Sequence, residues 1–122
     1  MSRNTLISLV DDHILIRGGL ASLINSFDGY TVLFEADHGQ HFIDQLSQHG
    51  EPSIVLLDIT MPKLNGLKAL RAIKAYDPAA TVIICTATGQ KSLIMEALHC
   101  GAKDFIIKPY FDRLIPALKN VE

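Results

Sequence analysis

The 122-residue sequence has no tryptophan, only two cysteines and no long hydrophobic run. The apolar stretch Leu6–Val10 stops at Asp11 and is far too short for a signal-peptide core or a membrane span. Cys85 and Cys100 form no C-x-x-C pair, and Cys85 lies inside an apolar run, where a thiol behaves as a small hydrophobe. These absences predict a cytoplasmic protein with no membrane contact and no redox or disulfide role.

The sequence also lacks an excess of charge. Lys and Arg total 11 and Asp and Glu total 13, giving a net charge of −2 and a pI near 6.2. A surface that grips nucleic acid through many phosphate contacts is therefore not expected. The hydrophobic content of 48% and charged content of 20% are typical of a folded domain. The length predicts one domain spanning residues 1–122.

Short apolar runs alternate with segments of helical periodicity along the chain. One such helical segment is marked by Ile16, Leu20, Leu23, Ile24 and Phe27. The predicted strands are Leu6–Val10, Thr31–Ala36, Ser53–Leu57, Thr81–Cys85 and the segment around Phe105–Ile107. Strands that alternate with helices pair in parallel through right-handed crossovers, which predicts a doubly wound α/β fold with helices on both faces. Pro116 requires the last helix to start near Leu114 or to bend.

Polar side chains stand where these strands end: Asp11, Asp12, Asp58, Thr86 and Lys108. The carboxyl ends of parallel strands share one edge of the sheet, so these residues are expected to converge. Three neighbouring carboxylates repel one another unless a hard cation neutralises them, which predicts Mg²⁺. Beside a cation and a lysine, Asp58 is the predicted nucleophile toward phosphorus, because positive charge offsets that of the transferring phosphoryl group.

From Leu6 to about Val121 the sequence resembles the receiver domains of bacterial two-component response regulators. The matching residues are the acid pair Asp11-Asp12, Asp58 followed by Met61-Pro62 and Gly66, Thr86-Ala87, and Lys108-Pro109. The resemblance implies a flavodoxin-like sheet of five parallel strands in the order 2-1-3-4-5. It also implies a signalling module with only self-phosphorylation and dephosphorylation as intrinsic activities.

The resemblance further implies how the site works. A sensor histidine kinase supplies a phosphoryl group from its phosphohistidine, and Asp58 accepts it. Mg²⁺ is held by the side chains of Asp12 and Asp58 and by the Thr60 carbonyl, with Asp11 acting through water. Thr86 and Phe105 carry the conformational switch, because Thr86 moves toward the phosphoryl group and the aromatic side chain turns inward.

Two further roles follow from the same resemblance. Lys108, in a Lys108-Pro109 peptide that is often cis in the family, contributes positive charge at the phosphoryl group. Thr60 and Thr88 occupy the positions through which receivers tune hydrolysis of the aspartyl phosphate. Neither is an acid or amide that would strongly orient water, so the phosphoryl lifetime is not expected to be especially short.

The residues after the acid pair are similar to those of the LuxR-type branch, namely His13, Arg17, Gly18 and Gly19. Members of that branch usually carry a DNA-binding output domain after the receiver, so DNA would be reached only through a segment outside this sequence. The alternative is a stand-alone receiver that acts through protein contacts. Phosphorylation-dependent dimerisation is also predicted, through a surface made by Leu93, Met95, His99 and Leu114.

Other interpretations of these residues compete with the receiver. A haloacid-dehalogenase-type phosphatase needs a second acid two residues after the nucleophile, but position 60 is Thr. A receiver that no longer accepts phosphate would lack some of the residues that are present here. A zinc site at His38, His41 and His49 is disfavoured against plain surface polarity. The basic stripe Lys63, Lys68, Arg71 and Lys74 is expected to be a solvated helix face.

Overall fold

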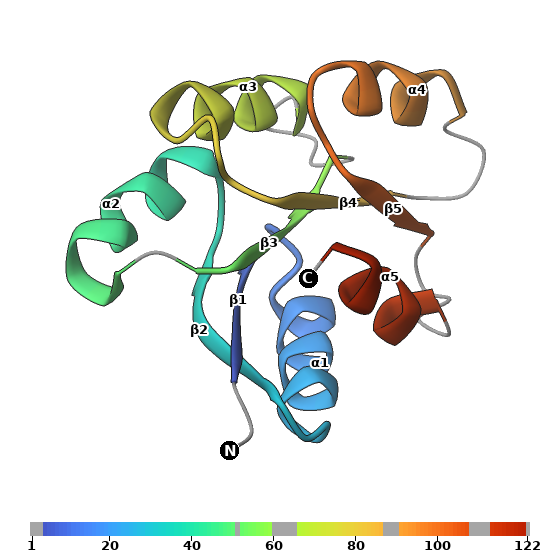
Figure 1. Cartoon of the computed structure of the whole chain (residues 1–122). Helices are drawn as coiled ribbons and strands as arrows, with labels where there is room; N and C mark the ends of the chain where they lie inside the picture. The colour runs from blue at the N-terminus through green and yellow to red at the C-terminus, as the bar shows by residue number, and fades with distance from the viewer. Residues whose placement is uncertain (1–3, 51, 60–65, 87–90, 108–112, 122) are drawn as a thin grey trace.

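Five parallel strands form one sheet in the order β2-β1-β3-β4-β5. The computed structural model describes residues 4–50, 52–59, 66–86, 91–107 and 113–121. The strands are β1 (Thr5–Val10), β2 (Tyr30–Ala36), β3 (Ile54–Asp58), β4 (Val82–Thr86) and β5 (Asp104–Ile107). Figure 1 shows the sheet running through the middle of the molecule with helices on either side. The predicted fold class and strand order are therefore confirmed.

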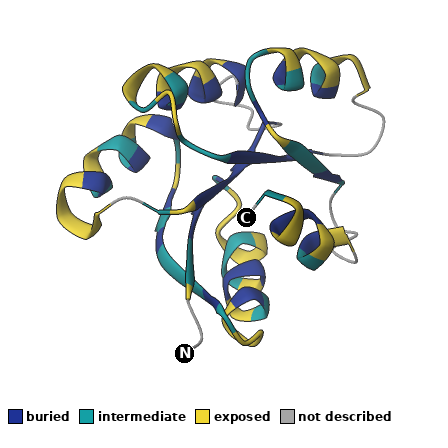
Figure 2. Cartoon of the chain, viewed as in Figure 1, coloured by how far each residue is buried: buried dark blue, intermediate teal, exposed yellow. Residues whose placement is uncertain are grey.

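The five helices cover both faces of the sheet. They are α1 (Ile14–Asn25), α2 (Gly39–His49), α3 (Gly66–Tyr76), α4 (Lys91–His99) and α5 (Leu114–Val121). Successive side chains of β3 point to opposite faces. Ile54 and Leu56 pack with α1 and α5, whereas Val55 and Leu57 pack with α2, α3 and α4. Because both faces are covered, all five residues of β3 are buried (Figure 2).

The ends of β3 and β4 differ from the prediction by one residue. Asp58 and Thr86 were expected just beyond their strands, but each is the last residue of its strand. Asp58 pairs with Cys85 across the sheet, and the amide of Ile59 donates to the Cys85 carbonyl over 3.0 Å. Apolar runs identify buried side chains, whereas backbone pairing continues through a polar residue. Both side chains are consequently set by strand geometry.

The last helix begins at Leu114, so Pro116 lies in its first turn, where a missing N–H group is tolerated. The alternative of a bent helix is wrong. Leu114 itself is only 1% exposed and belongs to the core between α1, α5 and the sheet. Its predicted contribution to a dimer surface is therefore also wrong, because the Leu114 side chain packs into this core.

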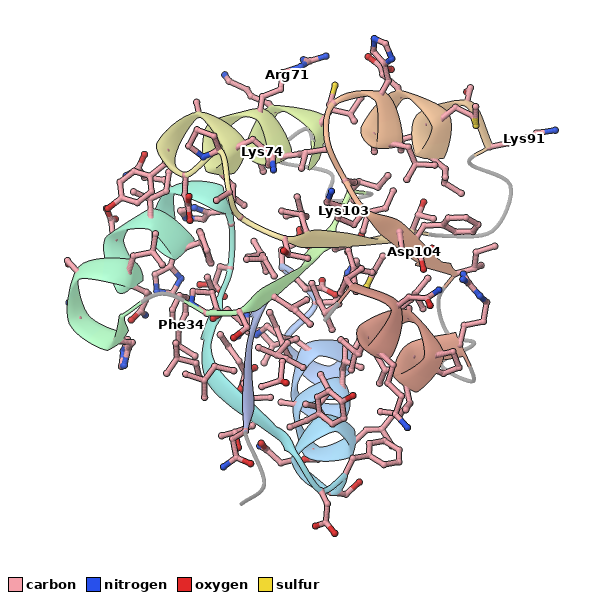
Figure 3. The ribbon with its side chains drawn as sticks, in the orientation of Figure 1. Phe34, Arg71, Lys74, Lys91, Lys103 and Asp104 are labelled. Carbon is pink, nitrogen blue, oxygen red and sulfur yellow. The ribbon has the colours of Figure 1, made fainter. Side chains whose placement is uncertain are left out.

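The basic face of α3 is largely solvated, as predicted. Lys68 and Arg71 are exposed, and Arg71 points away from the helix layer (Figure 3). Lys74 differs, because its ammonium donates to the carbonyls of Pro78 and Ala80 over 2.8 and 2.9 Å and so fastens the turn after α3. Lys63 lies outside the described residues. Within the described part of the chain, no helix has the length and hydropathy to cross a membrane.

Candidate functional site

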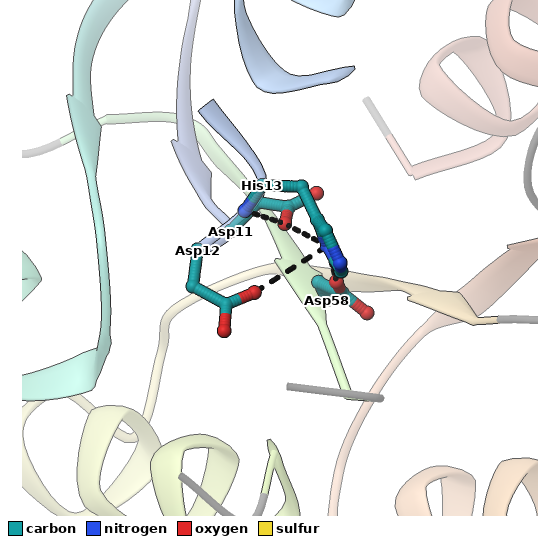
Figure 4. A group of neighbouring side chains, drawn as sticks. All are labelled: Asp11, Asp12, His13 and Asp58. Carbon is teal, nitrogen blue, oxygen red and sulfur yellow. Dashed lines mark hydrogen bonds and ion pairs between the residues drawn. The ribbon is translucent and has the colours of Figure 1, made fainter. Parts of the chain in front are cut away.

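Four ligand-bearing side chains meet at the carboxyl edge of the sheet. Asp11, Asp12 and His13 follow β1, and Asp58 ends β3, the strand beside β1. One ligand atom from each of the four lies within 4.8 Å of the others. Figure 4 shows the three carboxylates around the His13 ring. The three acids thus lie close together as expected, and His13 belongs to the same group of side chains.

Burial divides these four residues. The side chain of Asp58 has no exposed surface and that of Asp11 is 8% exposed. Those of Asp12 and His13 are 29% and 49% exposed. A buried carboxylate with carboxylate neighbours is costly unless positive charge offsets it. The site therefore combines the deeply placed carboxylate of Asp58 with a rim at Asp12 and His13 that solvent can reach.

Hydrogen bonds fix the segment that carries the acid pair. The Asp11 amide donates to the Ala36 carbonyl at the end of β2 over 3.0 Å. The Asp11 carboxylate accepts the amide of His13 over 2.8 Å, a turn typical of aspartate before a helix. His13 then serves as the N-cap residue of α1 with an extended backbone. The chain is thereby turned sharply from strand to helix, with both acids at the sheet edge.

Arg17 of α1 also holds the segment that carries the acid pair through hydrogen bonds. Its Nη1 donates to the Asp11 carbonyl over 2.7 Å and to Asp37 Oδ1 over 2.6 Å. Its Nε donates to Glu35 Oε1 over 2.9 Å. The hydrogen bond from Arg17 lowers the pKa of Asp37. Burial opposes the charge on Arg17, but its hydrogen bonds with Asp37 and Glu35 outweigh burial and raise the pKa of the guanidinium.

The two predicted switch residues lie on neighbouring strands. Thr86 is fully buried at the end of β4, and Phe105 of β5 pairs with Ile84 in the register of the sheet. Because side chains alternate along a strand, Phe105 shares a sheet face with Ile84 and Thr86. The ring of Phe105 is half-buried against the core that includes α4. A movement of the Thr86 side chain would therefore change the packing on the sheet face that carries Phe105.

Three of the predicted site residues, Thr60, Thr88 and Lys108, lie outside the described residues. Their predicted roles stay predictions. The sequence placed His13 near the sheet edge without giving it a role in the site, and it missed Arg17, which supports the segment that carries the acid pair. The signal for His13 was its place directly after the acid pair, and the signal for Arg17 was a basic residue one helical turn further on.

The donor set fits a hard divalent cation. Three carboxylates supply the oxygen ligands that Mg²⁺ prefers. Asp12 Oδ1 is buried and accepts no hydrogen bond from the described residues, although His13 Nδ1 lies 3.4 Å from it. An acidic group of this kind is typical of the Mg²⁺ site of receiver domains.

The fold and this acidic edge define a class of protein. Residues 7–119 match the family described as the response regulator receiver domain, and the chain belongs to that family. The resemblance to receivers is thereby confirmed. Membership makes the protein a signalling module of two-component systems and displaces the phosphatase alternative.

The relatives include chemotaxis proteins. The chain is 38% identical over 115 residues to the chemotaxis protein CheY of Bacillus subtilis, covering 93% of this chain and 94% of that protein. It is 40% identical over 114 residues to CheY of Thermotoga maritima, covering 93% of each. A crystal structure of a LuxR-family response regulator from Aurantimonas superposes with a TM-score of 0.87 at 30% identity, covering 97% of this chain and 84% of that one.

Proposed function

We propose that this chain is a phospho-accepting receiver whose acceptor is Asp58 and whose output is a contact with another protein. The observation that carries the proposal is the fully buried carboxylate of Asp58 beside Asp11 and Asp12. The sensor histidine kinase is the partner that membership in this family implies. The match to this chain covers more than nine-tenths of each of two CheY proteins. This coverage supports a receiver that works without a fused output domain.

The proposed reaction is transfer from a phosphohistidine. A carboxylate oxygen of Asp58 forms a P–O bond while the donor's P–N bond breaks, and the donor imidazole keeps the electron pair and takes up a proton. Mg²⁺, when bound by Asp12 and Asp58 side chains and the Thr60 carbonyl, with Asp11 acting through water, supplies the positive charge that phosphoryl transfer needs.

Other residues of this chain are assigned supporting roles. The Thr86 hydroxyl donates to a phosphoryl oxygen and Lys108 adds positive charge beside it. Phe105 follows the movement of Thr86 through packing alone, because its ring has no hydroxyl to hydrogen-bond a partner. Thr60 and Thr88 are assigned the role of setting how fast water removes the phosphoryl group.

An exposed apolar turn borders the acceptor and suits the incoming kinase. Ile14, Leu15 and Ile16 open α1 directly after His13 and are 67%, 91% and 42% exposed. Three adjacent exposed aliphatic side chains at the site edge are unusual for a surface that meets only water. We assign them to contact with the donor domain, because a phosphohistidine must come within bonding distance of Asp58 at this edge.

The second candidate output is control of transcription through a LuxR-type DNA-binding domain. The superposition on the LuxR-family structure favours it, as does the sequence after the acid pair. Transcription regulators that read two half-sites bind DNA as dimers, so this function predicts dimerisation on phosphorylation. A stand-alone receiver has no DNA half-sites to match and therefore does not require a dimer. Sedimentation with and without beryllofluoride separates the two. A dimer with beryllofluoride favours transcription control, and an unchanged monomer favours the stand-alone receiver.

Phosphorylation itself is tested with a small donor. The protein is incubated with Mg²⁺ and acetyl phosphate, and its intact mass is measured beside that of Asp58→Asn. Wild type should gain one phosphoryl group that is lost on mild alkaline treatment, and the variant should gain none. Equal labelling of both proteins, or no labelling of wild type, contradicts the assignment of Asp58.

A further inference from the structure

His13 brings a nitrogen atom into a group that is otherwise made of carboxylates. Its Nδ1 lies 3.1 Å from Asp11 Oδ1, 3.4 Å from Asp12 Oδ1 and 3.6 Å from Asp58 Oδ2 (Figure 4). A ring nitrogen so placed can donate a hydrogen bond to a carboxylate or bind a cation that the carboxylates share. Within the part of the chain that the structure describes, this is the one group of acidic and nitrogen side chains close enough to hold an ion.

The spacing suits ligands of a single ion. Two ligand atoms that bind one ion at about 2.1 Å lie roughly 3.0 to 3.4 Å apart in octahedral or tetrahedral arrangements. The separation of 3.4 Å from His13 Nδ1 to Asp12 Oδ1, a proposed direct ligand, falls in this range. Asp11 Oδ1 lies 3.1 Å from the same nitrogen, but Asp11 is assigned a contact through water. The separation to Asp58 Oδ2 is slightly longer. A small adjustment of an imidazole that is half exposed would bring the nitrogen to the same ion as the carboxylates.

The type of ligand atom decides which divalent ion the site binds more tightly. Mg²⁺ favours oxygen ligands and gives up water reluctantly. Imidazole nitrogen suits first-row transition ions, whose affinity for mixed nitrogen and oxygen sites rises along the series from Mn²⁺. Carboxylates alone suit Mg²⁺ and Mn²⁺ alike as ligand types, and a nitrogen ligand from His13 would strengthen the preference for the transition ion.

We propose that the His13 imidazole is a nitrogen ligand of the receiver's divalent-cation site and shifts its preference from Mg²⁺ toward transition ions such as Mn²⁺. This inference rests on the proposed function, because it concerns the same acidic site. It adds that replacing His13 raises the Mn²⁺ concentration needed for phosphoryl transfer to this chain more than it raises the Mg²⁺ concentration.

The direct test is pulsed electron paramagnetic resonance of the Mn²⁺-bound protein. Nitrogen coordination adds ¹⁴N modulation to the electron spin echo, and labelling the histidines with ¹⁵N should change that modulation without altering the protein. His13→Phe should abolish it. His99→Phe, the same substitution at an exposed position of α4, should leave it intact. Modulation that is absent from wild type, or retained in His13→Phe, overturns the proposal.

Calorimetric titration gives the selectivity. His13→Phe should lower the affinity for Mn²⁺ at least tenfold, the scale on which metal sites respond to the loss of a supporting group. Its affinity for Mg²⁺ should change less than about threefold on the same scale. Equal losses for both ions overturn the proposal. Labelling of wild type by acetyl phosphate with Mg²⁺ is measured in parallel, so a failed receiver assignment is distinguishable from a failed ligand assignment.

Discussion

The guanidinium of Arg113 lies over the ring of Phe105, with Cζ 5.1 Å from the ring centroid. The same side chain donates from Nη1 to the Phe105 carbonyl over 2.7 Å. Its Nη2 is 3.4 Å from both carboxylate oxygens of Asp104, which is labelled on β5 in Figure 3. Arg113, the residue before α5, thus contacts the ring and the carbonyl of Phe105, the proposed switch residue, and also the carboxylate of Asp104. An inward turn of Phe105 must give up the ring contact.

The first prediction concerns the contacts of Arg113 with Phe105. Arg113→Met keeps a long apolar side chain but removes the charge and the donors, so Phe105 should turn inward more readily. The expected cost in stability is about 0.5 to 1 kcal/mol, typical of an exposed cation–π contact. The ring is followed by ¹⁹F resonances of fluorophenylalanine-labelled protein, with Arg71→Met as the control on α3. If the Phe105 resonance is the same in both variants, Arg113 does not restrain the ring.

The second prediction concerns the close approach of α3 to Ile59, the residue that follows β3. A Cβ atom on Gly66 would collide with Ile59 Cα and would lie 2.7 Å from the Ile59 carbonyl carbon. Backbone atoms cannot move aside as a flexible side chain does. Gly66→Ala should therefore lower the free energy of unfolding by about 1 to 3 kcal/mol, the range for overpacking a core. Because the sequence has no tryptophan, urea unfolding is followed by circular dichroism.

Gly18→Ala is the matched control for this substitution. Gly18 lies inside α1, and an added Cβ would meet no atom within 4 Å. Alanine there should raise the free energy of unfolding by up to about 1 kcal/mol, the difference in helix propensity. Opposite signs at the two glycines are the expected result. A loss of stability at both positions would point to a general intolerance of alanine and would remove the argument from the Ile59 contact.

The fold was predictable because its signal is local and repeated. The runs that end in Val10, Leu57 and Cys85 are buried on both faces, and such runs are hard to mistake for anything but central parallel strands. The strand ends were predicted less well, since Asp58 still pairs with Cys85 although its side chain interrupts the apolar run. The burial of Leu114 depends on how α5 packs against the sheet, which periodicity near a proline does not specify.

The sequence predicted that the acids of the site lie together, but it did not predict how His13 and Arg17 are arranged around them. Asp11, Asp12 and Asp58 end neighbouring strands, and topology alone brings them together. The orientation of the His13 ring depends on side-chain torsions that no sequence pattern encodes. Arg17 was missed as a support because its partners, Glu35 and Asp37, stand on another strand end and have no fixed spacing from it.

The third prediction follows from the pKa of Asp37, which the Arg17 hydrogen bond lowers. A lowered folded-state pKa means that the carboxylate adds stability above its unfolded-state pKa and loses it as pH falls through the folded-state value. Asp37→Asn should therefore be less stable than wild type near neutral pH, with the gap closing below about pH 4. Half of the side chain is exposed, so the gap should stay below about 1 kcal/mol.

Unfolding of both proteins between neutral and acid pH checks this prediction. In an Arg17→Met background the same Asp37→Asn substitution should show no such pH-dependent gap, because the partner that lowers the pKa is gone. A gap that persists in that background would assign the effect to another neighbour, such as His41, whose Nδ1 lies 3.7 Å from Asp37 Oδ2.

The fourth prediction concerns repulsion among the carboxylates. Asp12→Asn is isosteric and removes one of three negative charges whose ligand atoms lie within 4.8 Å. In EDTA the variant should be more stable than wild type by about 1 kcal/mol, the Coulomb energy of two charges 4 Å apart in water. Added Mg²⁺ should raise the melting temperature of wild type but scarcely that of the variant. Asp44→Asn, on the exposed face of α2, should respond to Mg²⁺ as wild type does. Identical responses of all three proteins would contradict a cation at Asp12.

The last prediction concerns the apolar turn that opens α1. Leu15 is 91% exposed, so Leu15→Ser removes no core packing and should leave stability and labelling by acetyl phosphate unchanged. Transfer from a kinase should fall, because burying a leucine in an interface contributes about 1.5 to 3 kcal/mol, which corresponds to roughly tenfold or more in rate. Autophosphorylated sensor kinases of the source organism are first profiled with wild type, and the fastest donor is then used for the variant.

Met95→Ser is the matched control, because Met95 is 60% exposed on α4, far along the chain from the acid pair. It should leave transfer from the same kinase unchanged, since α4 is not the helix that borders the acceptor. Equal slowing by both substitutions would mean that the donor meets a wider face than α1. Transfer at the wild-type rate in Leu15→Ser would remove the turn from the proposed kinase contact, while an unchanged acetyl phosphate reaction would still support Asp58 as the acceptor.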